Sequence, residues 1–209
     1  MSKTWVSFIY ILLLASCDYK KPWICIDDCE NGSGTKIWKD GGLEVGEWKN
    51  GNQHGKGKQV FGRSSEFFGD MYEGEFKDGV YEGTGFYYDK SRDGHYKGEW
   101  KNGQPNGQGR SFSGPKHEHP GMTYEGQWKN NLYDGKGILY WGEKGEFAHD
   151  KYVGEWKNGK MDGFGKYYWA NGNVYEGSWQ KDKQHGEGIY IIKDGDTLKG
   201  HFENGQYKK

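Results

Sequence analysis

The strongest constraint on this 209-residue chain is a five-residue pattern that returns seven times. It reads aromatic, any residue, glycine, any residue, tryptophan or phenylalanine, as in Tyr152-Val153-Gly154-Glu155-Trp156. Its glycines are Gly46, Gly74, Gly98, Gly126, Gly154, Gly177 and Gly200. Its rings are Trp48, Tyr72, Phe76, Tyr96, Trp100, Tyr124, Trp128, Tyr152, Trp156, Tyr175, Trp179 and Phe202, with Glu44 and Leu198 in place of two tyrosines. A fixed period of this kind indicates a repeat architecture.

Most copies continue through a turn into a second glycine-bearing segment, as in Asn158-Gly159 followed by Gly163-Phe164-Gly165. Asn-Gly is the strongest short signal for a two-residue hairpin, because both central residues need positive φ. The same step recurs at Asn50-Gly51, Asp78-Gly79, Asn102-Gly103 and Asn204-Gly205, and Asn131 stands at the glycine position of another copy. We therefore predict one β-hairpin per copy.

Alternate side chains of a strand share a face, so the tyrosine, glycine and tryptophan of each copy point the same way. The Gly-x-Gly pair of the second strand lies across from these rings and leaves room for them on bare backbone. We interpret this face first as a packing ladder and second as a binding surface. Since only 33% of residues are hydrophobic, we expect an all-β, elongated, twisted, mostly single-layer antiparallel sheet of about 14 strands.

The full unit, Tyr-x-Gly-x-Trp-x-x-Gly-x-x-x-Gly-x-Gly, spans 152–165 and resembles the MORN repeat (membrane occupation and recognition nexus). The resemblance assigns 31–209 to an array of about seven copies, the first and last incomplete. It implies a role in assembly, dimerisation or membrane-proximal positioning, and phospholipid binding is also claimed for the family. Some members carry a lipid kinase or lysine methyltransferase domain. The array here reaches the end of the sequence, so we expect no enzyme.

The N-terminus has a different character, with Lys3 followed by an apolar run from Trp5 to Leu14. A short apolar run behind a basic residue predicts an export signal over 1–16. Leu14-Ala15-Ser16-Cys17 resembles the bacterial lipobox, which implies lipidation of Cys17 and a tether and cap over 17–30. The alternative is an ordinary export signal followed by an incidental cysteine. The expected location is the bacterial envelope, in the periplasm or on the cell surface, and the choice between inner and outer membrane stays open.

Cys25 and Cys29 form an even pair once Cys17 is set aside. In an oxidising compartment, such a pair favours a disulfide. Metal binding by two thiols without nearby partners is the alternative. The pair immediately precedes Gly32-Ser33-Gly34-Thr35, which aligns with a second-strand half-repeat, and we expect it to cap the exposed first strand.

A search for catalytic motifs finds no phosphate-binding loop, no Gly-x-Ser-x-Gly elbow and no His-Glu-x-x-His pair. His54 and His185 precede Gly-x-Gly pairs, where we expect them to hydrogen-bond the turn. His117-Glu118-His119 offers a weak metal site without an evident third ligand. The net charge of −1, from 29 basic and 30 acidic residues, is a poor match for nucleic acid. We expect no cofactor, no metal and no nucleic acid.

The spacing of copies alternates because three connections are longer: Gly62–Asp70, Ser113–Gly121 and Gly142–Asp150. They should line one edge of the sheet, either as tolerated loops or as a binding edge. The last strand, near 198–207, lacks its partner half, so we predict an unpaired edge suited to dimerisation.

Three functions compete at this point. The favoured one is a lipid-anchored, non-enzymatic scaffold with an unidentified protein partner or a second copy, held at the membrane through Cys17. The second is recognition of an envelope glycan by exposed rows of tyrosine and tryptophan. The third is an enzyme built on His117, His119 and loop carboxylates.

Overall fold

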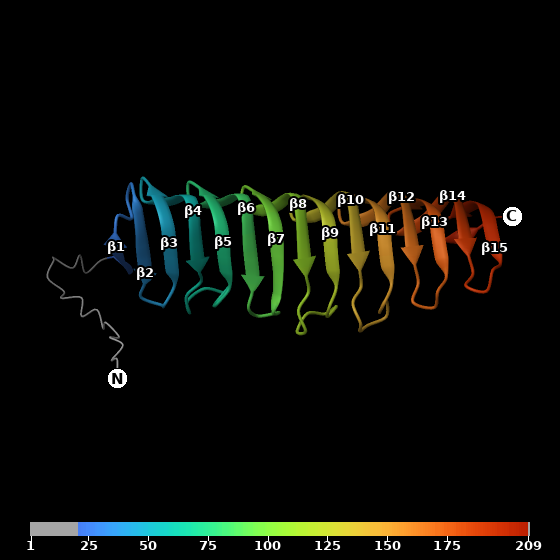
Figure 1. Cartoon of the computed structure of the whole chain (residues 1–209), viewed down its shortest axis with the longest axis horizontal. Coiled ribbons are helices and arrows are strands. Elements are labelled where there is room, and N and C mark those ends of the chain that lie inside the picture. Colours follow the sequence, from blue (N-terminus) through green and yellow to red (C-terminus); the bar gives the residue numbers. More distant parts are fainter. Residues whose placement is uncertain (1–20, 209) are drawn as a thin grey trace, which may run out of the picture.

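The protein forms a single 16-stranded sheet in which the spatial order of the strands is their order in the sequence. The structure is a computed structural model and describes residues 21–208; the expected signal segment and Cys17 lie outside them. Figure 1 shows the strands side by side along one long axis, with β1 and β15 near opposite ends of the array. The predicted fold class, an open antiparallel sheet of successive hairpins, is confirmed.

The strands alternate direction throughout the described residues, each pairing with the next in an antiparallel register. Their bounds are β1 (Trp23–Asp27), β2 (Ser33–Trp38), β3 (Leu43–Lys49), β4 (Asn52–Val60), β5 (Met71–Lys77), β6 (Val80–Asp89), β7 (Gly94–Lys101), β8 (Gln104–Phe112), β9 (Thr123–Lys129), β10 (Leu132–Tyr140), β11 (Lys151–Lys157), β12 (Lys160–Tyr168), β13 (Val174–Gln180), β14 (Lys183–Ile191), β15 (Thr197–Glu203) and β16 (Gln206–Tyr207). The expectation of about 14 strands was low because short strands close both ends.

Two-residue turns join the strands along one edge, which we call the turn edge. Both residues have positive φ at the predicted steps, for example Asn50 at 48° and Gly51 at 74°. Asn131, at φ 65°, takes the glycine position as predicted. The turn at Lys181 and Asp182 adopts the same conformation, with φ of 49° and 68°, although its sequence has no Asn-Gly signal. The hairpin geometry therefore holds where the local sequence is less favourable, because the neighbouring hairpins fix the register.

The connections along the opposite edge, the loop edge, are more varied in length. The three longer ones follow β4, β8 and β10, so they leave the sheet on the same side, as predicted. In Figure 1 they lie below the strands, spaced along the same edge. This edge exposes apolar side chains at Phe67, Phe68 and Phe147.

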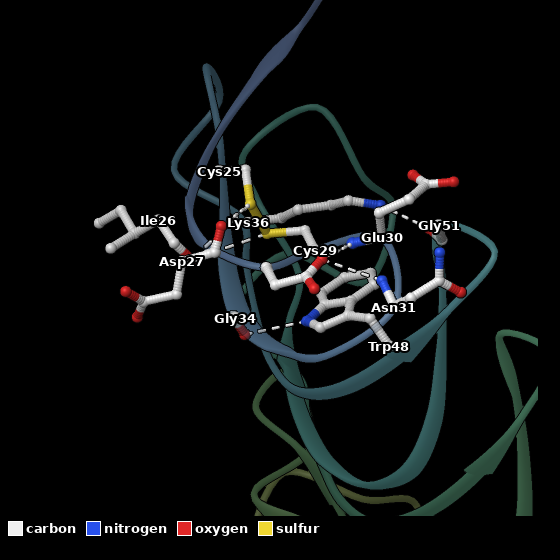
Figure 2. The surroundings of a disulfide bond; sticks show 11 residues. Cys25, Ile26, Asp27, Cys29, Glu30, Asn31, Gly34, Lys36, Trp48 and Gly51 are labelled. Carbon is white, nitrogen blue, oxygen red and sulfur yellow. Dashed lines mark hydrogen bonds between the residues drawn. A yellow bond between two sulfur atoms is a disulfide. The ribbon is translucent and has the colours of Figure 1, made fainter.

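The N-terminal end of the sheet is closed by β1, which pairs with β2 over its whole length. A disulfide joins Cys25 to Cys29, with the Cα atoms 6.1 Å apart. Beneath it, the Lys36 ammonium lies 4.1 Å from the ring centre of Trp48 and donates a 2.7 Å hydrogen bond to the Gly51 carbonyl (Figure 2). Burial lowers the pKa of Lys36. In the copy that lacks its tyrosine, a cation thus covers the tryptophan in place of a second ring.

The C-terminal end corrects the prediction of an unpaired edge. The short strand β16 pairs with β15 at Phe202 and Glu203. The Tyr207 ring lies over Gly200, and its hydroxyl donates to the Lys199 carbonyl at 3.2 Å. The chain therefore folds back and covers part of the edge of β15 with a two-residue strand and one aromatic side chain.

Candidate functional site: the two faces of the sheet

One face of the sheet, which we call the ring face, carries the tyrosines and tryptophans of the repeats. Tyr72, Tyr124, Tyr152 and Tyr175 are completely buried. Each donates its hydroxyl proton to the carbonyl three residues ahead, as Tyr152 does to Glu155 at 3.0 Å. The ring covers the glycine of the next strand, since a Cβ added to Gly165 would lie 2.2 Å from the Tyr152 oxygen. Bare backbone is therefore a requirement of this packing.

The tryptophans connect each copy to the one before it. The Trp179 Nε1–H donates to the Gly165 carbonyl at 3.2 Å, and the Trp128 Nε1–H donates to Gly109 at 3.1 Å. The Trp156 ring meets Tyr152 edge to face at 5.0 Å and Tyr124 of the preceding copy at 5.7 Å. Aromatic pairs at these distances and angles are favourable. The ring face is thus one continuous core that runs the length of the array.

A glutamate or glutamine side chain holds the turn-edge half of five hairpins. Glu155 accepts a hydrogen bond from the backbone N–H of Phe164 at 3.0 Å, beside Gly163 at φ 108°. Glu47, Glu75, Glu99 and Gln127 make the equivalent bond in their own copies. These side chains fix the local irregularity at which the register of the two strands shifts.

Two carboxylates on the loop edge are buried. Asp150 accepts hydrogen bonds from the Tyr167 hydroxyl at 2.6 Å and from the backbone N–H of Ala170 at 2.8 Å. Asp70 makes the same two bonds with Tyr87 and Lys90. The negative partner and burial together raise the pKa of Tyr167 and of Tyr87, burial being the larger cause. Two of the three longer loops are thereby fastened to the second strand after them, β6 and β12, and to the connection that follows it.

The buried tyrosines predict a loss of stability in alkali. Burial is the main cause that raises the pKa of Tyr175 to about 12, with a smaller contribution from the charge of Glu187. In the unfolded chain the group ionises near pH 10. A raised folded pKa gives stability that is complete below about pH 10 and is lost as the pH rises towards about 12. Urea unfolding followed by tryptophan fluorescence should show a midpoint that falls steeply above pH 10.

The variant Tyr175→Phe provides the control, because phenylalanine has no proton to lose. Its unfolding midpoint should fall less steeply above pH 10 than that of the unchanged chain. Equal slopes would show that other groups, and not the buried tyrosines, set the alkaline limit.

The ring face offers no platform for a glycan. Recognition of a sugar requires rings that are open to solvent, whereas the repeat tyrosines and tryptophans are covered by one another. The predicted residues of this face are therefore brought together as a core. The glycan hypothesis, which required them to be exposed, loses its physical basis.

The histidines give a mixed result. His54 Nδ1 lies 3.2 Å from Asp78 in the next turn, as expected, but the buried Nδ1 of His185 has no hydrogen-bond partner in the described structure. His117 uses its Nδ1 to accept the backbone N–H of His119 at 3.1 Å. Across residues 21–208, no group of three or more potential metal ligands is present. The structure therefore brings no third ligand to His117 and His119.

The opposite surface, which we call the open face, differs in kind. Its side chains alternate with those of the ring face along every strand. Ile138 is 42% exposed and Phe164 is 57% exposed. Together with Val153, they line a shallow groove whose floor is the bare glycine backbone of β9–β12. These residues lie outside the repeat consensus, because most other copies carry charged or polar side chains at the same positions.

The family model described as "MORN repeat" matches residues 30–43, 45–65, 72–93, 96–112, 124–146, 152–174 and 175–197. No curated protein matches the chain. Within the described residues, the structure contains no helix that is long and apolar enough to span a bilayer.

Two solved structures are similar in fold, both of the SAS-4 TCP domain of Drosophila melanogaster. One, a complex with a proline-rich motif of dSTIL, is 13% identical over 88% of this chain and 90% of the other, with a TM-score of 0.46. The second is 14% identical over 87% of this chain and 99% of the other, with a TM-score of 0.43.

Proposed function

Because the chain belongs to the MORN repeat family, we propose that it is a membrane-anchored, non-enzymatic scaffold of the bacterial envelope that binds protein through its open face. A MORN array of this kind is a repeat module for protein interaction. The described residues form one long sheet with regularly spaced strands, which suits the binding of an elongated partner.

One observation carries the proposal: the ring face is closed by its own side chains, while the open face keeps apolar groups in contact with water. Ile138, Val153 and Phe164 lie together there, at the centre of a groove bordered by charged side chains. Exposed apolar patches with a polar rim are typical of protein interaction sites. The open face is therefore the surface that this array presents to a partner.

The membrane part of the proposal rests on the sequence Leu14-Ala15-Ser16-Cys17. Two or three acyl chains on Cys17 would anchor the chain stably, whereas one chain gives marginal binding. The strand β1 begins at Trp23, six positions beyond Cys17. Such a short tether would hold the start of the array close to the bilayer surface.

A photo-crosslinking probe tests the binding face. A benzophenone side chain in place of Phe164 should give a discrete protein adduct when the full chain is irradiated in its native envelope. The control places the same probe at Phe67, which is 47% exposed in the loop-edge connection after β4 and is therefore outside the open face. Adducts that are absent at 164, or equal at both positions, would remove the proposal that the open face binds protein.

The lipid anchor is tested separately, by membrane fractionation and by intact mass. The variant Cys17→Ser should leave the membrane fraction, and the intact mass of the unchanged chain should show acyl groups on a protein that starts at Cys17. Recovery of the variant in the membrane fraction to the same extent would reject the anchor and leave the binding face to be judged by its own result.

A further inference from the structure

We infer that the open face binds a second copy of this chain, laid face to face and reversed along the array. The two copies would be related by a two-fold axis that lies in the interface, parallel to the strands, between β10 and β11. This inference rests on the proposed function in one respect, since it uses the same open face. It goes further by identifying the partner.

The middle row of the open face supplies the first argument. From β8 to β13, cross-strand partners in the sheet place six side chains in line: Arg110, Glu125, Ile138, Val153, Lys166 and Glu176. Their character is positive, negative, apolar, apolar, positive, negative. A closed two-fold interface requires a surface that is complementary to itself. This row is complementary to itself when it is reversed about its centre, between Ile138 and Val153.

The two-fold axis exchanges the strands in pairs, β10 with β11, β9 with β12 and β8 with β13. Ile138 then lies on Val153 of the second copy, and Glu125 lies on Lys166 of the second copy. Arg110 likewise faces Glu176. Every charge in the row thus meets the opposite charge, and the apolar pair meets itself, which is the electrostatic complementarity that fixes orientation between partners.

At the two central strands, the rows on either side obey the same symmetry. Towards the turn edge, Lys136 and Glu155 are cross-strand partners, so each would face the other residue in the second copy. Towards the loop edge, Tyr140 and Lys151 are partners in the same way, so each lysine would lie on a tyrosine ring. Three rows therefore agree on one axis at β10 and β11, while further out in the turn-edge row Gln127 would lie on Phe164 of the second copy.

The outer strands of the patch add apolar contact. On the loop-edge row, Phe112 of β8 would meet Val174 of β13. The fit ends one strand further out, where Glu99 of β7 would face Glu187 of β14. The contact is therefore limited to the six strands β8–β13.

The size of this patch matches a stable dimer. Six strands about 4.8 Å apart, with about seven residues of 3.4 Å each, cover roughly 700 Å² on each copy. A standard protein interface buries about 800 Å² on each partner. Sheets that pack face to face lie about 10 Å apart, which leaves room for both layers of side chains.

The charged groups already form partial pairs within one copy. Lys166 lies 3.1 Å from Glu176 and both are part-exposed, and Arg110 is the cross-strand neighbour of Glu125. Dimerisation would bring one pair of each copy onto the other pair and join them into two four-membered networks. The edge strand β15, by contrast, is covered by Tyr207 over part of its length, so the face is the better surface for a second copy.

Charge reversal tests the inference on the full chain, extracted in detergent and studied by sedimentation equilibrium at matched density. The unchanged chain should be a dimer. E125K and K166E should each raise the dissociation constant about tenfold or more, since the symmetry places two pairs of like charges in every dimer. An equimolar mixture of E125K and K166E should restore dimers, because both pairs then regain opposite charges.

The matched control is K58E. Lys58 lies on the same face and forms a similar ion pair with Glu73, at 3.4 Å, but β4 is outside the six-strand patch. This variant should dimerise as the unchanged chain does. A monomeric unchanged chain, a dimer insensitive to E125K, or a mixture that stays monomeric would each overturn the inference. Adducts of the Phe164 probe with a different protein, together with a monomeric chain, would retain the scaffold function and reject the dimer alone.

Discussion

Replacement of Gly165 by alanine is expected to destabilise the array by about 3 kcal/mol, the upper end of the usual cost of overpacking. The added Cβ would lie 2.2 Å from the Tyr152 oxygen and 2.4 Å from its Cζ. The Tyr152 ring is completely buried and packs against Trp156 and Trp179, so it has no free direction in which to move. Urea titration of the purified variant measures the loss directly.

Gly159→Asn is the matched control for this experiment. Gly159 lies in a turn at φ 78°, and the nearest atom to an added Cβ is 3.7 Å away. Asn131 occupies the same place in another hairpin at φ 65°. This variant should change the free energy of unfolding by less than about 0.5 kcal/mol.

A double variant tests whether the loss of stability in Gly165→Ala comes from the clash with the Tyr152 ring. In a Tyr152→Leu chain the ring is gone, so the further change Gly165→Ala should cost much less than it does alone. Residues in direct contact show such non-additivity. Equal costs in the two backgrounds would contradict the account of a ring that lies on bare glycine.

Trp179→Ala should also have a large effect, with a loss of about 3–5 kcal/mol in the free energy of unfolding. The Trp179 ring contacts Tyr175 at 5.2 Å within its own copy and Tyr152 at 5.5 Å in the preceding one. Its indole N–H also donates to the Gly165 carbonyl. Hydrogen exchange of the backbone amides should show β13–β16 opening before the rest, since the variant weakens the contact between two copies.

Trp179→Phe distinguishes the ring from its hydrogen bond. Phe76 and Phe202 stand at the tryptophan position of two other copies. Phe76 meets Tyr72 of its own copy edge to face, and Phe202 meets Tyr175 of the preceding copy in the same way. Loss of the hydrogen bond alone should cost about 1 kcal/mol. A cost for the phenylalanine variant as large as for alanine would show that the hydrogen bond, and not the packing, joins the copies.

The burial of Tyr152 on Gly165 could be predicted because two local rules determine it. The period of two places the ring on one face, and the turn at Asn158 and Gly159 sets the strand opposite. Since both signals lie within fifteen residues, the sequence contains the whole contact.

Other contacts could not be predicted, because they depend on register shifts and on chain reversal that the repeat spacing does not indicate. The bond between Asp150 and Tyr167 spans a hairpin whose register shifts between Gly154 and Trp156, so spacing alone does not align the two side chains. The bond from Phe164 to Glu155 depends on the same irregularity. At the C-terminus, Tyr207 closes the edge by folding back, where the repeat pattern indicated only a missing half.

The apolar patch on the open face is still harder to predict from the sequence. Ile138 and Val153 belong to different copies. Other copies carry Lys58, Arg110 or Lys166 at the position of Ile138, and Lys97 or Glu176 at the position of Val153. Their proximity follows from the cross-strand register over six strands. The repeat consensus describes what the copies share, whereas a binding surface is formed by what they do not share.

The strict succession of strands, each bonded only to its neighbours in the chain, also has a consequence for how the molecule folds. Sheet proteins commonly fold slowly because their strands must find partners far away in sequence. Here every pairing closes a short loop, so the sheet can grow by addition of one hairpin to a preformed template from any starting point. A polypeptide of this kind can acquire its structure progressively while the remainder is still being delivered.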